Sequence, residues 1–386
     1  MTEHVVHEAV GPPLSPRAAA ACLALGVNGL LVVGVLPILL GLLADDHRLS
    51  AAGIGQTAMI ELLCMGLATA ALGFVRRPRR VRLIAIAASI GMALADLATL
   101  PATGAEIFAA RAAGGTMEGV LLWVSVSMIS RTVTPERWAA VFFTAQTAAQ
   151  LVLAVGMAVW LVPRWGVNGG YVALAVVALI GAAPAGLIPD RFAPLVSAPG
   201  ESGAPPARGW AALVATFIYV SGSGAVFVYG VPLAHQAGVS SGVVATAQWV
   251  FLAAQVVAGF VATLLAGRVN YFTVYIFATA VYLAVWALLL HPLSAWVFTA
   301  AYAATGFGAL LFGAFLVPMT IDADPSRRAA MQSGAAQVLG GAAGPLLGSW
   351  TVRGGNVHGV LALGAVLLLV GMAAIAALRF TARPPR

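Results

Sequence analysis

The sequence predicts an all-α membrane protein with twelve transmembrane helices. Hydrophobic residues make up 61% of the 386 residues and charged residues only 9%, whereas soluble domains contain about 25% charged residues. The apolar stretches are about 20 residues long, the length that crosses a bilayer as a helix. Arginine gathers in alternate loops between these stretches, as loops on one side of a membrane do. Twelve crossings with short loops would use nearly the whole chain.

The expected helices are defined by apolar runs between Gly, Pro and charged residues. The first run follows a short polar leader and is long enough to be retained as a helix, so we expect no cleaved signal peptide. The predicted crossings are residues 18–43, 53–75, 83–101, 104–130, 138–162, 168–189, 209–234, 241–266, 271–290, 294–319, 328–351 and 356–379.

A polar segment near the midpoint divides these helices into six and six. It reads "DRFAPLVSAPGESGAPPARG" and is rich in Pro, Gly and Ser, a composition typical of a linker. We therefore predict a leader at 1–17, a first bundle at 18–189, a linker at 190–208, a second bundle at 209–379 and a tail at 380–386.

The placement of arginine predicts the orientation. With both termini in the cytoplasm, sixteen of the twenty basic residues fall on inside segments and three, Arg48, Arg164 and Arg353, on outside loops, while Arg111 lies within a helix. Such a bias favours an even number of crossings. It also explains the net charge of +7 without nucleic acid as a partner. We expect a multi-pass protein of the bacterial inner membrane with both termini cytoplasmic.

The sequences of the two halves are weakly similar. "LSAAGIGQTAMIELL" opens the second helix and "VSSGVVATAQWVFLA" opens the eighth, each after an outside loop. Parallel repeats about an axis along the membrane normal leave this kind of similarity.

The whole chain resembles transporters of the major facilitator superfamily. In helix four, "RAAGGTMEG" is similar to the family's Arg-x-x-x-Gly pattern at Arg111 and Gly115, and "RRPRRVR" resembles its basic loop after helix two. The loop departs from the family at Val75 and Pro78, where Asp and Gly are usual, so a latch built on that Asp is not expected. The resemblance implies two six-helix bundles that expose one central site alternately to each side.

Helix eleven carries a glycine-rich segment, "GGAAGPLLG". Gly340, Gly344 and Gly348 share one face and permit a close helix contact, and Pro345 can bend the helix. The family's drug-antiporter signature, Gly-Pro-x-x-Gly, is missing from helix five. We predict a packing and gating role for this segment rather than direct contact with a solute.

Three ionisable residues lie deep within predicted helices. Glu61 is about 12 Å along helix two at roughly 1.5 Å per residue, and Arg111 reaches a similar depth in helix four. Glu118 follows Arg111 by two turns on the same face. Because charges facing lipid are unfavourable, we expect all three to face the bundle interior.

We predict that Glu61 or Glu118 carries a proton and that Arg111 is its charge partner or an anchor for an anionic substrate. A permanent salt bridge between helices two and four is the alternative. Asp96, late in a peripheral helix, is expected near the outer interface. Asp45, Asp46, Asp322 and Asp324 are expected in solvated loops.

Neutral polar and aromatic residues in the remaining helices are candidates for substrate contact. The resemblance implies that helices seven, eight, ten and eleven line the cavity, and for each residue there helix packing is an equal alternative. The candidates are Asn28, Gln146 and Gln150 in the first half and Tyr219, Tyr229, Gln248, Gln255, Phe307 and Gln337 in the second.

These features predict a secondary transporter, proton-coupled, that moves a small organic solute through the lipid bilayer. Efflux is favoured, and uptake of an organic anion is the alternative. A membrane-embedded transferase is the rival of another class, and a channel is less favoured. The six His are scattered and Cys22 and Cys64 lie in apolar runs, so we expect no metal, no cofactor and no catalytic residues. A monomer is expected.

Overall fold

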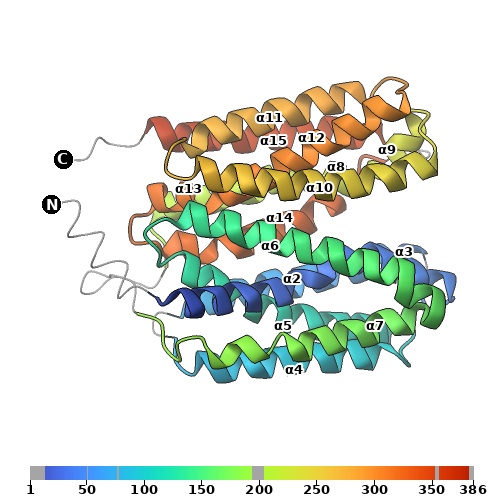
Figure 1. Cartoon of the computed structure of the whole chain (residues 1–386). Helices are drawn as coiled ribbons and strands as arrows, with labels where there is room; N and C mark the ends of the chain where they lie inside the picture. The colour runs from blue at the N-terminus through green and yellow to red at the C-terminus, as the bar shows by residue number, and fades with distance from the viewer. Residues whose placement is uncertain (1–13, 50, 76–77, 194–203, 353–355, 382–386) are drawn as a thin grey trace. The chain divides into compact units, whose positions relative to one another are not determined.

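The computed structural model describes residues 14–49, 51–75, 78–193, 204–352 and 356–381, and the named elements in these ranges are all helices (Figure 1). The chain divides into two compact units. Unit 1 runs to Val133 and resumes over Ala149–Ala204, and unit 2 takes Thr134–Ala148 and the chain from Pro205 onward. The predicted leader, linker and tail lie largely outside the described residues, so these boundaries stay predictions.

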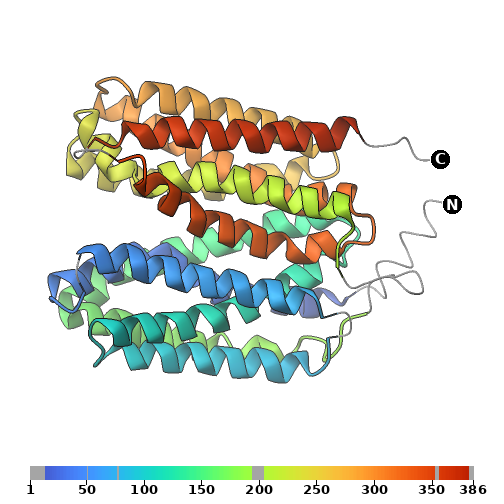
Figure 2. The ribbon, with the colours of Figure 1, turned by 180° about the vertical axis from the view of Figure 1, so that it is seen from behind.

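Unit 1 is built from long helices that run alongside one another (Figure 2). Within it, α5 packs against α2, α3 and α4, and α7 packs against α4. The elements are α2 (Pro16–Asp45), α3 (Ala51–Gly73), α4 (Val81–Thr99), α5 (Ala105–Ile129), the end of α6 (Pro135–Gly156), the π-helix η1 (Met157–Leu161), α7 (Val162–Ile180) and the 3₁₀ helix η2 (Ala183–Gly186).

Gly166 marks the turn between the fifth and sixth crossings. Its φ of 59° and ψ of −156° interrupt the helical geometry inside α7, in a backbone region that only glycine adopts without strain. The predicted break between residues 162 and 168 therefore lies at this glycine.

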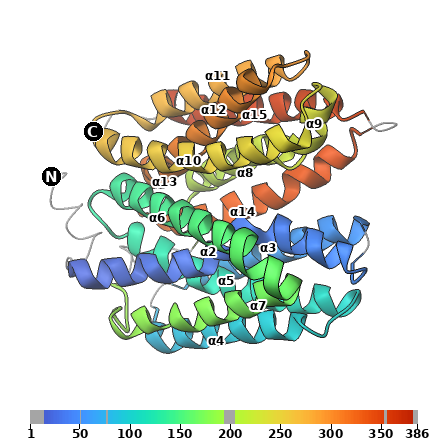
Figure 3. The ribbon, with the colours of Figure 1, turned by 45° about the vertical axis from the view of Figure 1, so that its right-hand side comes forward.

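Unit 2 has a second set of helices, with α14 and α15 packed on α8 and with α10 packed on α12 (Figure 3). Two of its crossings are interrupted. Tyr229 separates α8 from α9, and Phe315 separates α12 from α13. The elements are α8 (Ala207–Val228), α9 (Gly230–Gln236), α10 (Ser241–Leu265), α11 (Tyr271–Leu288), α12 (Ala295–Ala314), α13 (Leu316–Ala323), α14 (Arg328–Ser349) and α15 (His358–Phe380).

Over the described residues, the helices group into twelve candidate crossings. Among the described residues, nine runs are long and apolar enough to cross a membrane, and one of them, Arg137–Gly186, contains both α6 and α7. The continuous apolar part of α10 is shorter, Trp249–Leu265, and α14 is rich in Gly, Ala and Gln and has a lower mean hydropathy. The all-α fold class predicted from the sequence is confirmed.

Small residues bring neighbouring helices into backbone contact. A Cβ atom at Gly115 would collide with the Glu61 carbonyl oxygen, and one at Gly119 with the Met65 carbonyl oxygen, so α5 lies directly on α3. In unit 2, a Cβ atom at Gly340 would lie 2.7 Å from the Phe217 carbonyl oxygen.

The same close contact continues along α14. A Cβ atom at Gly344 would collide with the Ser221 carbonyl oxygen, and one at Gly348 would lie 3.1 Å from the Tyr229 ring. These glycines thus form the predicted close-packed face, which lies against α8 and its end. Pro345 lies inside α14.

Asp324 corrects one prediction. The sequence predicts a solvated side chain there, but Asp324 is only 1% exposed. Its carboxylate accepts hydrogen bonds from the Ser326 hydroxyl at 2.5 Å and from the Ala329 amide at 2.8 Å. The side chain therefore binds the Ala329 amide in the first turn of α14, a group that has no partner within the helix. Asp322 and Asp46 are exposed, and the side chain of Asp45 lies outside the described residues.

Candidate functional site: a buried charge cluster in unit 1

The site begins with Arg111, a charged residue without any exposed surface. Its helix, α5, starts after Gly104, whose φ is 50°, and carries Glu106 in the first turn, where a carboxylate favours helix formation. Arg111 follows the helix start by six residues, or about 9 Å. Its Nη1 atom donates a hydrogen bond to Oε1 of Glu61 on α3 at 3.2 Å, and Glu61 is also fully buried. The ion pair predicted between the second and fourth crossings is present.

Asp96 is the second partner of Arg111, and it corrects the prediction that this residue is peripheral. Its Oδ1 atom lies 2.9 Å from Arg111 Nη2, at angles outside those of a hydrogen bond. The residue is 5% exposed and lies three residues before the last residue of α4. The position of Asp96 late in α4 predicts only its depth in the membrane, whereas its contact with Arg111 arises because this face of α4 packs against α5.

Tyr171 on α7 packs on the same guanidinium. The Cζ atom of Arg111 lies 5.0 Å from the centre of the Tyr171 ring, within the range of a cation–π contact. Arg111 is therefore held by a side chain from each of three helices, α3, α4 and α7. Tyr171 was not among the predicted site residues, because an aromatic residue in an apolar helix carries no distinguishing signal.

Glu118 completes the cluster two turns further along α5. It is 2% exposed, and its carboxyl group interacts electrostatically with that of Glu61. Two ionised carboxylates repel each other, and the pair is favoured when one of them carries a proton that it can donate to the other. The two glutamates form a carboxyl pair, and Glu61 joins this pair to Arg111.

Several polar atoms of the cluster have no hydrogen-bond partner among the described residues. They are Glu61 Oε2, Glu118 Oε2, Arg111 Nε and the Tyr171 hydroxyl oxygen, all without exposed surface. Buried polar atoms are usually hydrogen-bonded, and exceptions concentrate where a water, proton or ligand completes the network. The cluster thus has unused hydrogen-bonding capacity at both glutamates.

Arg48 fixes the end of unit 1 that is nearest to Asp96. From the loop between α2 and α3 it donates to the carbonyl oxygens of Thr99 and Ala102, at the end of α4, and to the side-chain oxygen of Asn168 on α7 at 2.9 Å. Thr99 lies one turn from Asp96, and Asn168 lies one turn from Tyr171. Arg48 therefore ties together the two helices that supply these cluster residues.

The predicted substrate candidates of unit 1 use their polar groups within the protein. The Asn28 amide donates to the Ala178 carbonyl oxygen at 3.3 Å, and the Gln150 amide donates to the Leu30 carbonyl oxygen at 2.7 Å. Both side chains are buried. Their roles in solute binding stay predictions, and each has a packing role as well.

The candidates of unit 2 are more varied. Tyr219 is fully buried, with its hydroxyl 3.0 Å from Thr279, and Gln255 accepts a hydrogen bond from Thr147 at 3.1 Å. Gln146 has a buried side-chain oxygen without a partner among the described residues. Tyr229, Phe307 and Gln337 are half-buried, and the side chain of Gln248 lies outside the described residues.

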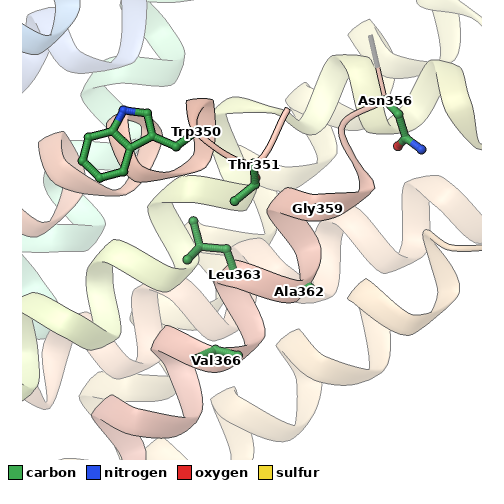
Figure 4. Close-up of a pocket in the computed structure, with 7 residues that line it drawn as sticks. All are labelled: Trp350, Thr351, Asn356, Gly359, Ala362, Leu363 and Val366. Atoms are coloured by element: carbon green, nitrogen blue, oxygen red, sulfur yellow. The ribbon is translucent and has the colours of Figure 1, made fainter. Parts of the chain in front are cut away.

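A separate surface hollow of about 600 Å³ lies at the end of α14 and the start of α15 (Figure 4). No charged residue lines it, and Trp350 and Val366 on its rim are 71% and 58% exposed. The lining residues are Trp350, Thr351, Asn356, Gly359, Ala362, Leu363 and Val366. The hollow offers none of the ionisable groups of the cluster.

Metal chemistry finds no support in the described part of the chain. It contains no group of three or more His, Cys, Asp or Glu residues arranged to hold a metal ion. Cys22 and Cys64 are both free thiols.

The helical architecture is the fold of the major facilitator superfamily transporters. Two solved structures share it. One is FucP, described as a transporter of this superfamily in the outward conformation, with a TM-score of 0.71 and 12% identity over 95% of this chain and 99% of FucP. The other is a form of the E. coli fucose:proton symporter FucP, with a TM-score of 0.69 and 13% identity over 95% and 98% of the two chains.

Comparison by sequence gives no match, either to a protein-family model or to a curated protein. At 12% and 13% identity the likeness to FucP defines the fold and does not define a solute.

Proposed function

We propose that the protein is a secondary active transporter that moves a small organic solute across a membrane by alternating access and couples this movement to protons. The fold supports the first part, because the two solved structures that share it are described as transporters. The buried cluster of Arg111, Glu61, Asp96 and Glu118 is the observation that carries the second part.

The charge balance of the cluster favours bound protons. If all four groups were ionised, three carboxylates would face one guanidinium, leaving two uncompensated negative charges. Burying an unpaired charge is unfavourable by several kcal/mol, so the favoured state of the cluster is close to neutral and holds protons on carboxyl groups. A group that holds a proton inside a membrane protein, with unused hydrogen-bonding atoms beside it, can release that proton when its surroundings change.

Glu61 and Glu118 are the proposed proton carriers. Their carboxyl groups would repel each other if both were ionised, and each has an oxygen without a hydrogen-bond partner among the described residues. Arg111 is the charge partner of Glu61. Because both of its Nη atoms already face carboxylates, a role as anchor for an anionic substrate is less favoured.

The test uses the full-length protein in proteoliposomes that contain a pH-sensitive dye. We would add fucose, other sugars, organic acids and hydrophobic cations in turn and record the change in internal pH. One class of solute is expected to move protons, and Glu61→Gln and Glu118→Gln are expected to abolish this movement. Glu106→Gln is the matched control, because Glu106 is exposed at the start of the same helix and bonds the Thr103 amide at 3.1 Å.

Unchanged proton movement in both glutamine variants would contradict the proposal and leave the cluster as a permanent salt bridge. The same experiment separates a transporter from the transferase and channel alternatives, since neither of these couples a solute gradient to a proton gradient.

The direction of transport stays a prediction. The sequence favours efflux, whereas a solved structure of the same fold is described as a fucose:proton symporter, which favours uptake together with protons. The sign of the pH change decides between them. A solute that enters with protons acidifies the vesicle interior, whereas a solute that enters in exchange for protons makes it more alkaline.

A further inference from the structure

The three acids of the cluster differ in their contacts, and this difference suggests different roles. Glu61 and Glu118 interact with each other, and Glu61 also bonds Arg111. The close contact of Asp96 is with Arg111, at 2.9 Å, and this is the shorter of the two ion pairs that Arg111 makes. The cluster therefore consists of a carboxyl pair and one separate carboxylate, and Glu61 and Asp96 lie against different terminal nitrogens of the same guanidinium.

Packing between α4 and α5 fixes the position of Asp96. A Cβ atom at Gly114 would lie 3.6 Å from both the Ala95 methyl group and Arg111 Nη1, so the helices meet beside Asp96. One turn earlier on α4, a Cβ atom at Gly91 would lie 2.8 Å from the Met117 side chain. Arg48 secures the end of α4 through Thr99 and Ala102. Contacts on both sides of Asp96 therefore hold α4 in place, and this fixes the position of the Asp96 carboxylate beside Arg111.

We propose that Asp96 is a positioning residue: it remains the ionised partner of Arg111 while Glu61 and Glu118 gain and lose protons. This inference deepens the proposed function and depends on it. Asp96 and Arg111 together are neutral, so the guanidinium stays in place and compensated when Glu61 is protonated. When Glu61 releases its proton, it finds a cation already oriented toward it at hydrogen-bonding distance.

Of the helices packed against α4, α5 and α7 supply charged or titratable groups near Asp96, and η2 supplies none because it consists of Ala, Pro and Gly. Arg111 forms an ion pair with Asp96. The other charged and titratable groups belong to the same electrostatic cluster. Together, these groups are Arg111 and Glu118 on α5, Glu61 on α3, Tyr171 on α7 and Arg48 in the loop after α2. Neutralising Asp96 leaves Arg111 less compensated, which favours the ionised form of Glu61.

The test measures proton binding directly and needs no known solute. Infrared difference spectra of the purified full-length protein between acidic and alkaline pH report protonated carboxyl groups. Glu61→Gln or Glu118→Gln is expected to remove a protonated-carboxyl band. Asp96→Asn is expected to keep the band but to move its midpoint to lower pH, by about one unit, a shift typical of the loss of one nearby charge.

Further variants separate positioning from simple structural support. Asp96→Glu keeps the charge and is expected to keep the wild-type midpoint, and it also serves if Asp96→Asn fails to fold. In the double variant D96N/R111Q both charges of the pair are gone, so the midpoint is expected to return toward that of the wild type. Asp46→Asn, at an exposed aspartate, is the control and should leave the midpoint unchanged.

Two outcomes would overturn the inference. Asp96→Asn could leave the midpoint where it is in the wild type, or it could itself remove the protonated-carboxyl band while the glutamate variants retain it. If Glu61→Gln and Glu118→Gln stop proton-coupled transport while Asp96→Asn leaves the midpoint unmoved, the proposed function stands and the role of Asp96 fails. If the glutamate variants leave transport and its pH dependence intact, the proposed function itself fails.

Discussion

The buried centres of the two units are built from different chemistry. In unit 1, a fully buried Arg111 is surrounded by carboxyl groups and the Tyr171 ring. In unit 2, a fully buried Tyr219 lies edge-on to Tyr275 and Phe312, each with ring centres 5.1 Å apart, and its hydroxyl meets Thr279. The two ion pairs described above, Arg111–Glu61 and Arg111–Asp96, lie in unit 1.

This difference indicates in which unit a buried side chain can gain or lose a proton. Removing a proton from a carboxyl group beside Arg111 leaves a carboxylate, and the guanidinium that is already in place stabilises this negative charge. Tyr219 in unit 2 instead contacts aromatic rings and a threonine hydroxyl, and ionising a phenol in an apolar core is strongly disfavoured. We therefore expect proton binding to be confined to unit 1, and the aromatic cluster of unit 2 to serve packing.

The largest expected effect is the loss of stability when the guanidinium of Arg111 is removed. Arg111→Gln leaves Glu61 and Asp96 buried without a cation, and removing one partner of a buried ion pair typically costs about 3–5 kcal/mol. Thermal unfolding of the detergent-purified protein would measure this loss. Arg268→Gln in unit 2, at an exposed arginine that donates to the Leu264 carbonyl oxygen, should change stability by no more than about 0.5 kcal/mol. Equal effects of the two changes would remove the contrast between the units.

An intermediate effect is expected where both units use the same device, close glycine contacts. Gly115→Ala and Gly344→Ala each place a methyl group against a backbone carbonyl oxygen of the neighbouring helix, and such overpacking typically destabilises by about 1–3 kcal/mol. Gly341→Ala is the control, because its Cβ atom would meet nothing within 4 Å. If only Gly115→Ala lowered the melting temperature, the helix packing of the two units would differ more than their glycine contacts indicate.

The smallest effect concerns the aromatic centre of unit 2. Tyr219→Phe removes the hydrogen bond to Thr279 but keeps the ring contacts, so a loss of about 0.5–1.5 kcal/mol is expected. The midpoint of the protonated-carboxyl band in infrared spectra should not move. A shifted midpoint would show that unit 2 takes part in proton binding, contrary to the division drawn above.

The sequence by itself determined the architecture. Apolar runs of membrane-crossing length gave the helices, because the bilayer fixes their length and satisfies no backbone polar group. The same reasoning placed Glu61, Arg111 and Glu118 in the interior, since ionisable groups in such runs avoid lipid. It also placed the break near Gly166 and the glycine face of α14, because glycine has local conformational and steric signatures.

Only the tertiary structure decided which side chains meet. Asp96 and Tyr171 join Arg111 because α4 and α7 present particular faces toward α5, and helix rotation is set by packing between segments far apart in sequence. A carboxylate in a loop is usually solvated, yet Asp324 is buried and binds the Ala329 amide in the first turn of α14. Tyr219 likewise was a solute candidate by residue type, and its burial depends on the rings around it. The local sequence gives the type of each residue and its depth in the membrane. Its interaction partners depend on packing between helices, which the sequence of one helix does not specify.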